Sequence, residues 1–413
     1  MSSKKLHIAI FSGELPSTTF IEHLINGVAS THRVLLFGVK RPSAIIAYKD
    51  DVKMHITPQN KFKNLVVSLY RSFRLLLKRP KELMKLWKEV KRFKSRYDRW
   101  IWLTKFLPIV LYRPDVLHLQ WTRDLEFYTF FKTKFNIPLI VSLRGAHVNY
   151  TPIVEPKIAA VYKETFPHVD AFHAVSEAIV REASKYGDIE SRTRVIHSPV
   201  PNIYFNQFLP YAKNEKNTIN IVSIGRFHWV KGFRYAIDTL AQLKDQGYDV
   251  HYTIVGPNAF PEALTFQINQ LKIKDSITLK GKLPQNEVLT FLQTQDVLLL
   301  PSLQEGIANV VLEAMAIGLP VVSTDCGGMS EVVIHKKTGW LVPIRNPIAM
   351  ADAIVEIVES DAASINRVTQ EAHRLVKGQF NYDTSVQEFI SLYESVVESH
   401  LSFRRNPDSY RDD

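Results

Sequence analysis

Two glutamates stand eight positions apart in the strongly apolar stretch PSLQEGIANVVLEAMAIGLPVVST, residues 301–324. The run DVLLLPS predicts a buried strand, which places Glu305 in the turn at its carboxyl end. Asn309 is predicted to cap a helix that contains Glu313 and ends at Gly318. A carboxylate only accepts hydrogen bonds and offers two oxygens, so it can bind a pair of vicinal hydroxyls. Spacing alone gives equal weight to that interpretation and to ordinary loop and helix carboxylates.

The same helix start could hold a phosphate, because the free amides of residues 307–309 would point at it. A second stretch, INIVSIGRFHWVKGFRYAIDTLAQL, predicts a strand that ends at Ile224, a turn at Gly225 and a helix from about Lys231. Arg226 and Lys231 then flank a helix N-terminus, where each cation costs roughly 0.3–1 kcal/mol unless an anion is bound. Ordinary surface cations remain the alternative. Neither G-x-G-x-x-G nor the P-loop pattern occurs.

Alternating strands and helices position these turns. Strand-like runs in the first half are LHIAIF, HRVLLFGV, VLHLQW, IPLIVSL, AFHAV and TRVIHS, and those in the second half are INIVSIG, HYTIVG, SITLKG, DVLLLPS, PVVST and GWLVP. Such alternation indicates parallel sheets covered by helices. The proline- and asparagine-rich segment 199–218 is linker-like in composition. The sequence therefore predicts an α/β protein with two doubly wound, Rossmann-like domains and a cleft between them.

Composition restricts the class of protein. The 413 residues suffice for two or three cores, and 46% hydrophobic with 23% charged residues is ordinary for a globular chain. A single cysteine cannot form an internal disulfide, which suits a reducing cytoplasm. The first apolar run is too short for a signal peptide, and no run of 18 uncharged apolar residues occurs, so we expect a cytoplasmic protein without a spanning helix.

One segment carries the whole excess of positive charge. Residues 61–105 contain 15 Lys or Arg against 3 acids, so the remaining 37 cations and 38 acids sum to −1 of the net +11. Apolar residues recur there at helical spacing, with tyrosine and tryptophan among them. The pattern is typical of a helix on an anionic membrane surface, and equally of a solvated helix packed on its own domain.

The motifs resemble those of the retaining glycosyltransferases called group 1, or family 4. EGIANVVLEAMAIGLPVV resembles their E-x7-E segment, and GRFHWVKG at residues 225–232 resembles their diphosphate-binding turn. IVGPNAF, ITLKGKLPQNEV and GGMSEVVIHKKTGWLVP follow in the family's order, so the resemblance covers nearly all of 219–360. LPSTTFIEHLINGVA resembles the opening of polysaccharide-assembly members, with Thr18 in place of a usual Glu. The segment before the linker, AVSEAI and VIHSPVPNIYF, is similar as well.

The resemblance implies a GT-B fold. Its acceptor-side domain would span 1–202, with the C-terminal helix in 383–413 packing back on it, and its nucleotide-sugar-binding domain would span 203–382. Arg226 and Lys231 would hold the donor diphosphate and Glu313 the ribose. Glu305, with the amides of Gly306, Ile307, Ala308 and Asn309, would position the donor sugar. Gly13, ending the first strand, and Gly225 would let the backbone approach the donor, whose base would lie near Lys282 and Leu283.

The sequence departs from the family at a usual H-G-x-D segment. SLRGAHVN places Arg144 at the His position and His147 at the Asp position, and either residue could take the catalytic role of that His. No D-x-D occurs, which agrees with a metal-independent site. We expect no cofactor, since the nucleoside-diphosphate sugar is a substrate. The implied activity is retaining transfer of a sugar, of hexosyltransferase type, from a nucleoside-diphosphate sugar to a glycan or lipid-linked acceptor in surface polysaccharide biosynthesis.

Three alternatives belong to other classes. Paired carboxylates could serve a glycosidase, which has no use for two cations beside a helix N-terminus. A non-catalytic sugar-nucleotide-binding protein would keep the same donor contacts. A nucleic-acid-binding protein would explain the charge of 61–105 but leaves the second domain unexplained, so we expect no nucleic-acid partner. We expect instead that 61–105 binds an anionic membrane, with the enzyme peripheral on the inner face of the cytoplasmic membrane.

Overall fold

In a computed structural model, which describes residues 5–41, 48–212, 218–256 and 258–405, the chain forms two compact domains. The N-terminal domain comprises 1–175, 180–196 and 385–413, and the C-terminal domain comprises 176–179 and 197–384. The sequence placed these divisions at 202/203 and 382/383. Residues 406–413 lie outside the described residues.

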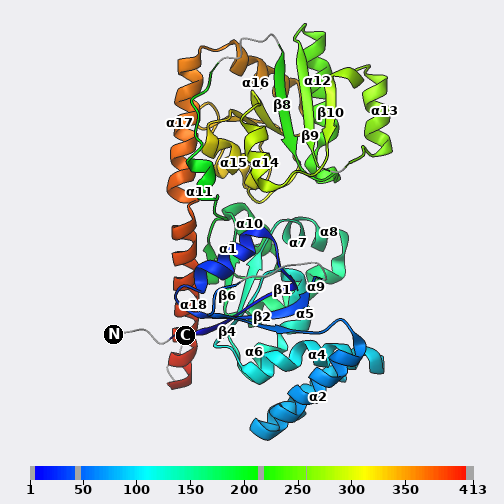
Figure 1. Ribbon diagram of the computed structural model, residues 1–413, viewed down its shortest axis with the longest axis vertical. Coiled ribbons are helices and arrows are strands. Elements are labelled where there is room, and N and C mark those ends of the chain that lie inside the picture. The colour runs from blue at the N-terminus through cyan, green and yellow to red at the C-terminus, as the bar shows by residue number, and fades with distance from the viewer. Residues whose placement is uncertain (1–4, 42–47, 213–217, 257, 406–413) are drawn as a thin grey trace. The chain divides into compact units, whose positions relative to one another are not determined.

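The N-terminal domain is built on a parallel sheet of seven strands in the order β3-β2-β1-β4-β5-β6-β7 (Figure 1). The strands are β1 (His7–Leu15), β2 (Arg33–Lys40), β3 (Val52–Ile56), β4 (Val116–Leu119), β5 (Leu139–Leu143), β6 (Ala171–Ala174) and β7 (Thr193–Val195). Every residue of β4 and β5 is buried, as expected for strands covered by helices on both faces. All six predicted strands are confirmed. The unpredicted β3 lies at the sheet edge, where Lys53 and Met54 are exposed.

Helices connect these strands. They are α1 (Thr19–Val28), α2 (Lys61–Lys78), α3 (Pro80–Val90), α4 (Arg96–Tyr112), α5 (Leu125–Tyr128), α6 (Phe130–Phe135), α7 (Ala146–Asn149), α8 (Thr151–Val154), α9 (Pro156–Thr165) and α10 (Glu177–Ala183). The basic segment therefore forms three helices, α2 to α4, inserted between β3 and β4.

The C-terminal domain has a parallel sheet of six strands in the order β10-β9-β8-β11-β12-β13. The strands are β8 (Ile219–Ile224), β9 (Val250–Val255), β10 (Ile277–Lys280), β11 (Val297–Leu300), β12 (Val321–Thr324) and β13 (Trp340–Val342). Its helices are α11 (Asn202–Phe205), α12 (Phe233–Asp245), α13 (Glu262–Gln270), α14 (Gln285–Leu292), α15 (Asn309–Ile317), α16 (Pro347–Glu359) and α17 (Ala362–Gln379). All six strands predicted for this half are confirmed.

The linker-like segment 199–218 is in large part a packed piece of the C-terminal domain. Val200, Tyr204 and Phe205 are buried in that domain's core, and the amide of Leu209 donates to the carbonyl of Ile317 at 3.0 Å. The interpretation of the whole segment as a linker is therefore wrong for its first part. Burial of its aromatic residues fixes this part on the domain despite its prolines and asparagines. Residues 213–217 lie outside the described residues.

The last helix, α18 (Tyr382–Arg405), returns to the N-terminal domain. Its Tyr393 hydroxyl lies 2.7 Å from His118 Nδ1 on β4, in a fully buried contact. His118 Nε2 lies 2.8 Å from the Ser142 hydroxyl on β5, which lies 2.8 Å from His173 Nδ1 on β6. This buried polar chain fixes α18 against three adjacent strands of the sheet.

Candidate functional site

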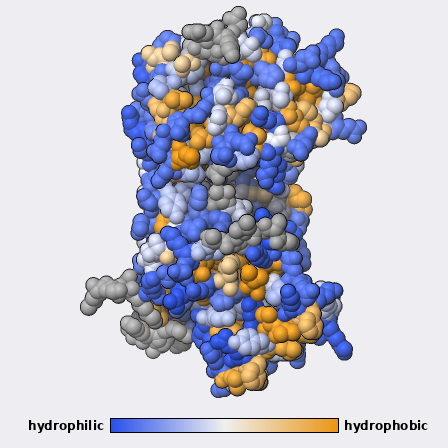
Figure 2. Space-filling model, viewed as in Figure 1, coloured by the Kyte–Doolittle hydropathy of each residue, from blue (hydrophilic) through white to orange (hydrophobic). Residues whose placement is uncertain are grey.

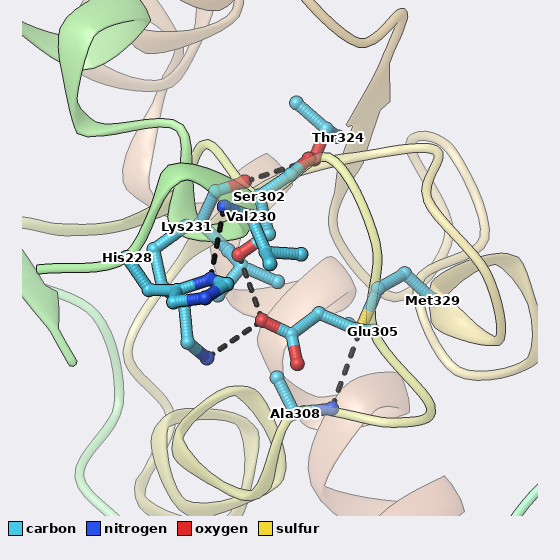
Figure 3. A network of polar contacts seen from close by, with 9 residues as sticks. His228, Val230, Lys231, Ser302, Glu305, Ala308, Thr324 and Met329 are labelled. Carbon is cyan, nitrogen blue, oxygen red and sulfur yellow. Dashed lines mark hydrogen bonds and ion pairs between the residues drawn. The ribbon is translucent and has the colours of Figure 1, made fainter. Parts of the chain in front are cut away.

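Two loops of the C-terminal domain meet in an ion pair. The loops follow β8 and β11, which are neighbours in the sheet, so their carboxyl ends lie side by side. Lys231 Nζ lies 2.7 Å from Glu305 Oε1, and the Ser302 hydroxyl donates to the same oxygen at 2.8 Å (Figure 3). The lysine side chain is 25% and the glutamate 15% exposed. Within the described part of the chain, no hydrogen bond reaches the other carboxylate oxygen, so Glu305 is oriented with one oxygen still available.

Glycines allow the loops to approach so closely. Gly232 has φ +64°, and a Cβ there would lie 2.0 Å from the carbonyl oxygen of Pro301. Gly327 has φ +60°, and its Cβ would lie 1.9 Å from the carbonyl oxygen of Glu305. Only glycine fits either position. Sequence reasoning missed the roles of Ser302, Gly232 and Gly327 in the loops, although both glycines stand inside the quoted motifs.

The turn after β8 has the expected local structure. Gly225 follows β8, and its amide donates to Val255 at 2.9 Å. A short 3-10 turn ends at Lys231, and α12 begins at Phe233, so both cations precede a helix N-terminus as predicted. Arg226 is exposed and makes no hydrogen bond or ion pair with any residue that the structure describes. Its guanidinium is therefore available to an anion.

The start of α15 differs from the prediction. Ala308, in extended conformation, occupies the N-cap, and Asn309 is the first helical residue with no side-chain capping bond. The expected Asn309 cap is therefore wrong by one position. The amide of Ala308 points at Met329 Sδ at 3.4 Å, and a thioether is a weak acceptor, so this amide could serve a stronger one (Figure 3). Gly318 ends the helix with φ +87°, as predicted.

Glu313 lies within α15, as predicted. Its side chain is partly buried, and burial raises the pKa of the Glu313 carboxyl to about 7. No ion pair or hydrogen bond to this carboxyl occurs among the described residues. A carboxyl so destabilised in its charged form would gain from ligand hydroxyls that donate to it. Lys282 and Leu283 follow β10; Lys282 is exposed, and Leu283 packs against the domain core.

The predicted residues of the N-terminal domain lie on β1 and after β5. Gly13 does not end the first strand, because β1 continues to Leu15; it has φ +86° at a bulge in the pairing with β2. Gly38 makes room for this bulge, since a Cβ there would lie 2.6 Å from the carbonyl oxygen of Gly13. Arg144 and His147 both come directly after β5, within one loop and the start of α7.

Arg144 and His147 are both desolvated. Burial lowers the pKa of the Arg144 guanidinium to about 9. The pKa of His147 is lowered by burial and, secondarily, by the charge of Arg123. Arg144 Nη2 donates to Gln120 Oε1 at 3.3 Å, and its Cζ lies 4.1 Å from the centre of the Phe20 ring. Because its pKa is lowered, His147 is a neutral imidazole near neutral pH.

Among the described residues, no three His, Cys, Asp or Glu side chains gather as a group able to hold a metal ion. No helix among those residues combines the length and apolarity required to cross a bilayer.

Two family models match the chain in succession. The model described as "Glycosyl transferase 4-like domain" matches residues 18–199, and "Glycosyl transferases group 1" matches residues 207–376. The second match contains both loops of the Lys231–Glu305 pair.

Two of the curated relatives are named for polysaccharide biosynthesis. The putative colanic acid biosynthesis glycosyltransferase WcaL of Escherichia coli is 30% identical over 263 residues, 62% of each chain. The amylovoran biosynthesis glycosyltransferase AmsK of Erwinia amylovora is 32% identical over 185 residues, 43% of this chain and 45% of the relative. The aligned regions thus span about half to three-fifths of the relatives' length.

Solved structures share the fold over nearly the whole chain. Anabaena HepE in complex with UDP and glucose matches with a TM-score of 0.67 at 18% identity, covering 94% of this chain and all (100%) of that one. Sucrose-phosphate synthase of Thermosynechococcus elongatus matches with a TM-score of 0.72 at 18% identity, covering 96% and 100%. With two parallel-sheet domains, a returning C-terminal helix and consecutive family matches over both halves, the chain belongs to the group 1 glycosyltransferases of GT-B fold.

Proposed function

We propose that the protein transfers a sugar from a nucleoside-diphosphate sugar to a glycan or lipid-linked acceptor during assembly of an extracellular polysaccharide. The observation that carries the proposal is the Lys231–Glu305 pair. It joins the loop that also carries the unpaired Arg226 to the loop that leads into α15. The relatives named for colanic acid and amylovoran biosynthesis support a polysaccharide pathway. The UDP in the HepE complexes supports a nucleotide-sugar donor.

The charges suggest how the donor would be activated. Arg226, Lys231 and the first amides of α15 would surround the diphosphate and stabilise the negative charge that develops as it leaves. This cationic surrounding reduces the need for a metal ion, so we propose metal-independent transfer. The free oxygen of Glu305 would accept a hydrogen bond from a donor-sugar hydroxyl, while Ser302 and Lys231 hold the other oxygen.

The proposed reaction retains the anomeric configuration. The bond between the anomeric carbon and the phosphate oxygen breaks, and the acceptor hydroxyl forms the new bond on the same face of the sugar. The hydroxyl proton passes to the departing phosphate, which becomes the nucleoside diphosphate. The protein's own part is to hold the phosphate and the sugar in place.

A donor screen tests this proposal. UDP-, GDP-, ADP- and TDP-sugars are added to the full chain, and the unfolding temperature is measured, since a ligand stabilises the state that binds it. Sugar nucleotides that carry one of these bases should raise the unfolding temperature of wild type, and raise that of Lys231→Ala much less. The exposed control Lys274→Ala should respond like wild type. Donor turnover with polysaccharide or lipid-linked acceptors then separates an enzyme from a sugar-nucleotide-binding protein. Absence of any response to the donors would contradict the proposal.

We also propose that α2 attaches the N-terminal domain to an anionic membrane, because this helix has its apolar side outward. Phe62, Leu69 and Leu77 are 74%, 62% and 69% exposed, whereas the residues buried against the domain include Asn64 and Ser68. The remaining exposed apolar residues of the helix are Leu65, Val66, Tyr70, Phe73 and Leu76. Figure 2 shows hydrophobic side chains gathered over α2, at the lower end of the N-terminal domain. Exposed apolar patches of this kind mark binding surfaces.

The rest of the basic segment has residues of both kinds, some packed on the domain and some available to a membrane surface. In α3, Leu83, Leu86 and Val90 are buried, so this helix packs on its own domain in the ordinary way. Phe93 is partly buried and stacks on Trp102 with ring centres 5.0 Å apart, so we do not assign it to the membrane surface. Trp87, 52% exposed, remains available.

The cations also divide. Arg79 donates to the carbonyl of Leu111 at 2.9 Å and Arg92 to that of Phe127 at 2.9 Å, so both serve the fold. Exposed lysines without a described partner remain for the membrane, each adding about 1 kcal/mol near an anionic surface. They include Lys78, Lys81, Lys88 and Lys91.

Sedimentation with phosphatidylglycerol-containing vesicles tests α2. Wild type should bind at low salt and be released by salt. Leu69→Gln/Phe73→Gln should bind weakly, as should a variant with the four lysines changed to Glu. The matched pair Lys157→Glu/Lys163→Glu on α9 should bind like wild type. If wild type fails to bind vesicles at low salt, α2 is not a membrane surface, and retention on DNA instead would favour the nucleic-acid alternative.

A further inference from the structure

Just after β5 lie three buried polar atoms that have no hydrogen-bond partner among the residues that the structure describes. They are Arg144 Nε, His147 Nδ1 and Asn149 Oδ1, all within six consecutive residues of the chain. Buried polar atoms in proteins are nearly always paired, and each exception requires an explanation. Because parallel sheets bind ligands at the carboxyl ends of their strands, a ligand is the natural partner for this group.

Arg144 carries a charge that no described carboxylate neutralises. Among the residues that the structure describes, no carboxylate forms an ion pair with this guanidinium; its polar contact is the neutral Gln120, and it stacks on the Phe20 ring. Desolvating a cation without a counter-charge is costly, so a purely structural role does not explain why an arginine stands at this position. Arg123 adds a second cation close enough to act on His147. The local potential therefore favours an anion.

The guanidinium is held in a fixed orientation. Gln120, which accepts from Arg144, has its amide nitrogen 3.1 Å from His118 Nδ1, and His118 is bound in turn by Tyr393 of α18. Gln120 and His118 are fully buried. A planar fork held in this way is prepared for two parallel hydrogen bonds to one oxyanion, at a small entropic cost.

We infer that Arg144 binds an oxyanion carried by a sugar substrate, either the carboxylate of an acidic sugar or a phosphate, with His147 as a neighbouring polar contact. The inference rests on the proposed function in taking the ligand to be a substrate of sugar transfer. It adds a second anion to the donor diphosphate, whose proposed contacts lie in the C-terminal domain. Acidic substrates would then be preferred over neutral ones.

Binding of simple sugars to the full chain tests the inference. Methyl glucuronide, glucose 6-phosphate and methyl glucoside are compared by saturation-transfer NMR in the presence of UDP. The glucuronide or the phosphate should bind, and the neutral glucoside should bind at least about tenfold more weakly, as expected for a charge-assisted pair. Arg144→Gln should remove the difference, Arg144→Lys should keep part of it, and the exposed control Arg33→Gln should keep all of it.

The outcomes separate the two anion sources and the two proposals. Binding of the glucuronide alone assigns a carboxylate, binding of the phosphate alone assigns a phosphorylated substrate, and binding of both assigns a general oxyanion site. Equal binding of charged and neutral sugars, or an unchanged preference in Arg144→Gln, overturns the inference. Unfolding without ligand gives a second measurement: Arg144→Met, which keeps a contact with Phe20, should unfold at a temperature no lower than wild type, whereas a structural arginine would lower it. UDP binding, measured in the same samples, reports on the proposed function separately.

Discussion

Replacing Glu313 by Gln should make the unliganded protein more stable at neutral and alkaline pH. Burial raises the pKa of this carboxyl from its ordinary value of 4.5 to about 7, so the folded state holds the proton more tightly than the unfolded chain does. Stability from this group is therefore complete below pH 4.5 and is lost as pH rises through about 7. A difference of about 2.5 pKa units corresponds to about 3 kcal/mol.

Urea unfolding of wild type and Glu313→Gln between pH 4.5 and 8.5 measures this difference. The variant cannot ionise, so its advantage over wild type should grow by up to about 1.4 kcal/mol per pH unit from about pH 5 and become constant above about pH 7. The exposed Glu262→Gln, on α13, serves as the control and should differ from wild type by the same small amount at every pH.

The affinity of wild type for the donor should change with pH in the opposite direction to its stability. If ribose hydroxyls donate to the ionised Glu313, affinity for the UDP-sugar should increase with pH up to about 7 and lose this increase in Glu313→Gln. UDP-glucose is a suitable ligand, because its phosphate diesters stay ionised throughout this range. A stability difference independent of pH would refute the burial argument. If the stability difference depends on pH but the variant binds the donor like wild type, only the ribose contact is refuted.

Five further variants test other parts of the structure. Arg226→Ala and Lys231→Ala should each weaken UDP-sugar binding by about 1.5–3 kcal/mol in calorimetry with little loss of folding stability; normal affinity in both would remove them from the diphosphate site. Glu305→Gln should reduce turnover more than donor affinity, because its oxygen is proposed to hold the reacting sugar; an unchanged rate would contradict that role. Gly327→Ala should lower the unfolding temperature, since the new Cβ would lie 1.9 Å from a carbonyl oxygen. Tyr393→Phe should cost about 1–3 kcal/mol by removing the hydroxyl that contacts buried His118 Nδ1, and a neutral effect in urea unfolding would show that the contact is dispensable.

Strands were predictable here because parallel strands buried on both faces are continuous apolar runs. The edge strand β3 was missed because VKMHI mixes a lysine and a histidine with apolar residues, and an edge position tolerates them. The start of the supposed linker was misinterpreted for the opposite reason. Its prolines and asparagines dominate the composition, but Tyr204 and Phe205 decide where it packs.

Predicting contacts between motifs was harder. The Lys231–Glu305 pair joins residues 74 positions apart and depends on β8 and β11 being neighbours, which local sequence does not specify. Periodicity located the apolar stripe of α2, but it gives only the face of a helix and not the direction in which that face is turned. The pairing partners of Arg144 were equally hidden, because Gln120 and Phe20 come from separate elements.

The contact between α18 and β4 has a consequence for biosynthesis. Residues 118 and 393 are 275 positions apart, so the ribosome has already released β4 and the entire C-terminal domain before the helix that completes the N-terminal domain emerges. Apart from residues 176–179, the C-terminal domain is one continuous stretch from 197 to 384, so it can fold first although it is synthesised second. Until α18 is synthesised, His118 lacks its contact with Tyr393 and the core of the N-terminal domain is incomplete. A stop codon or protease cut near residue 385 would therefore damage the half of the protein made earliest.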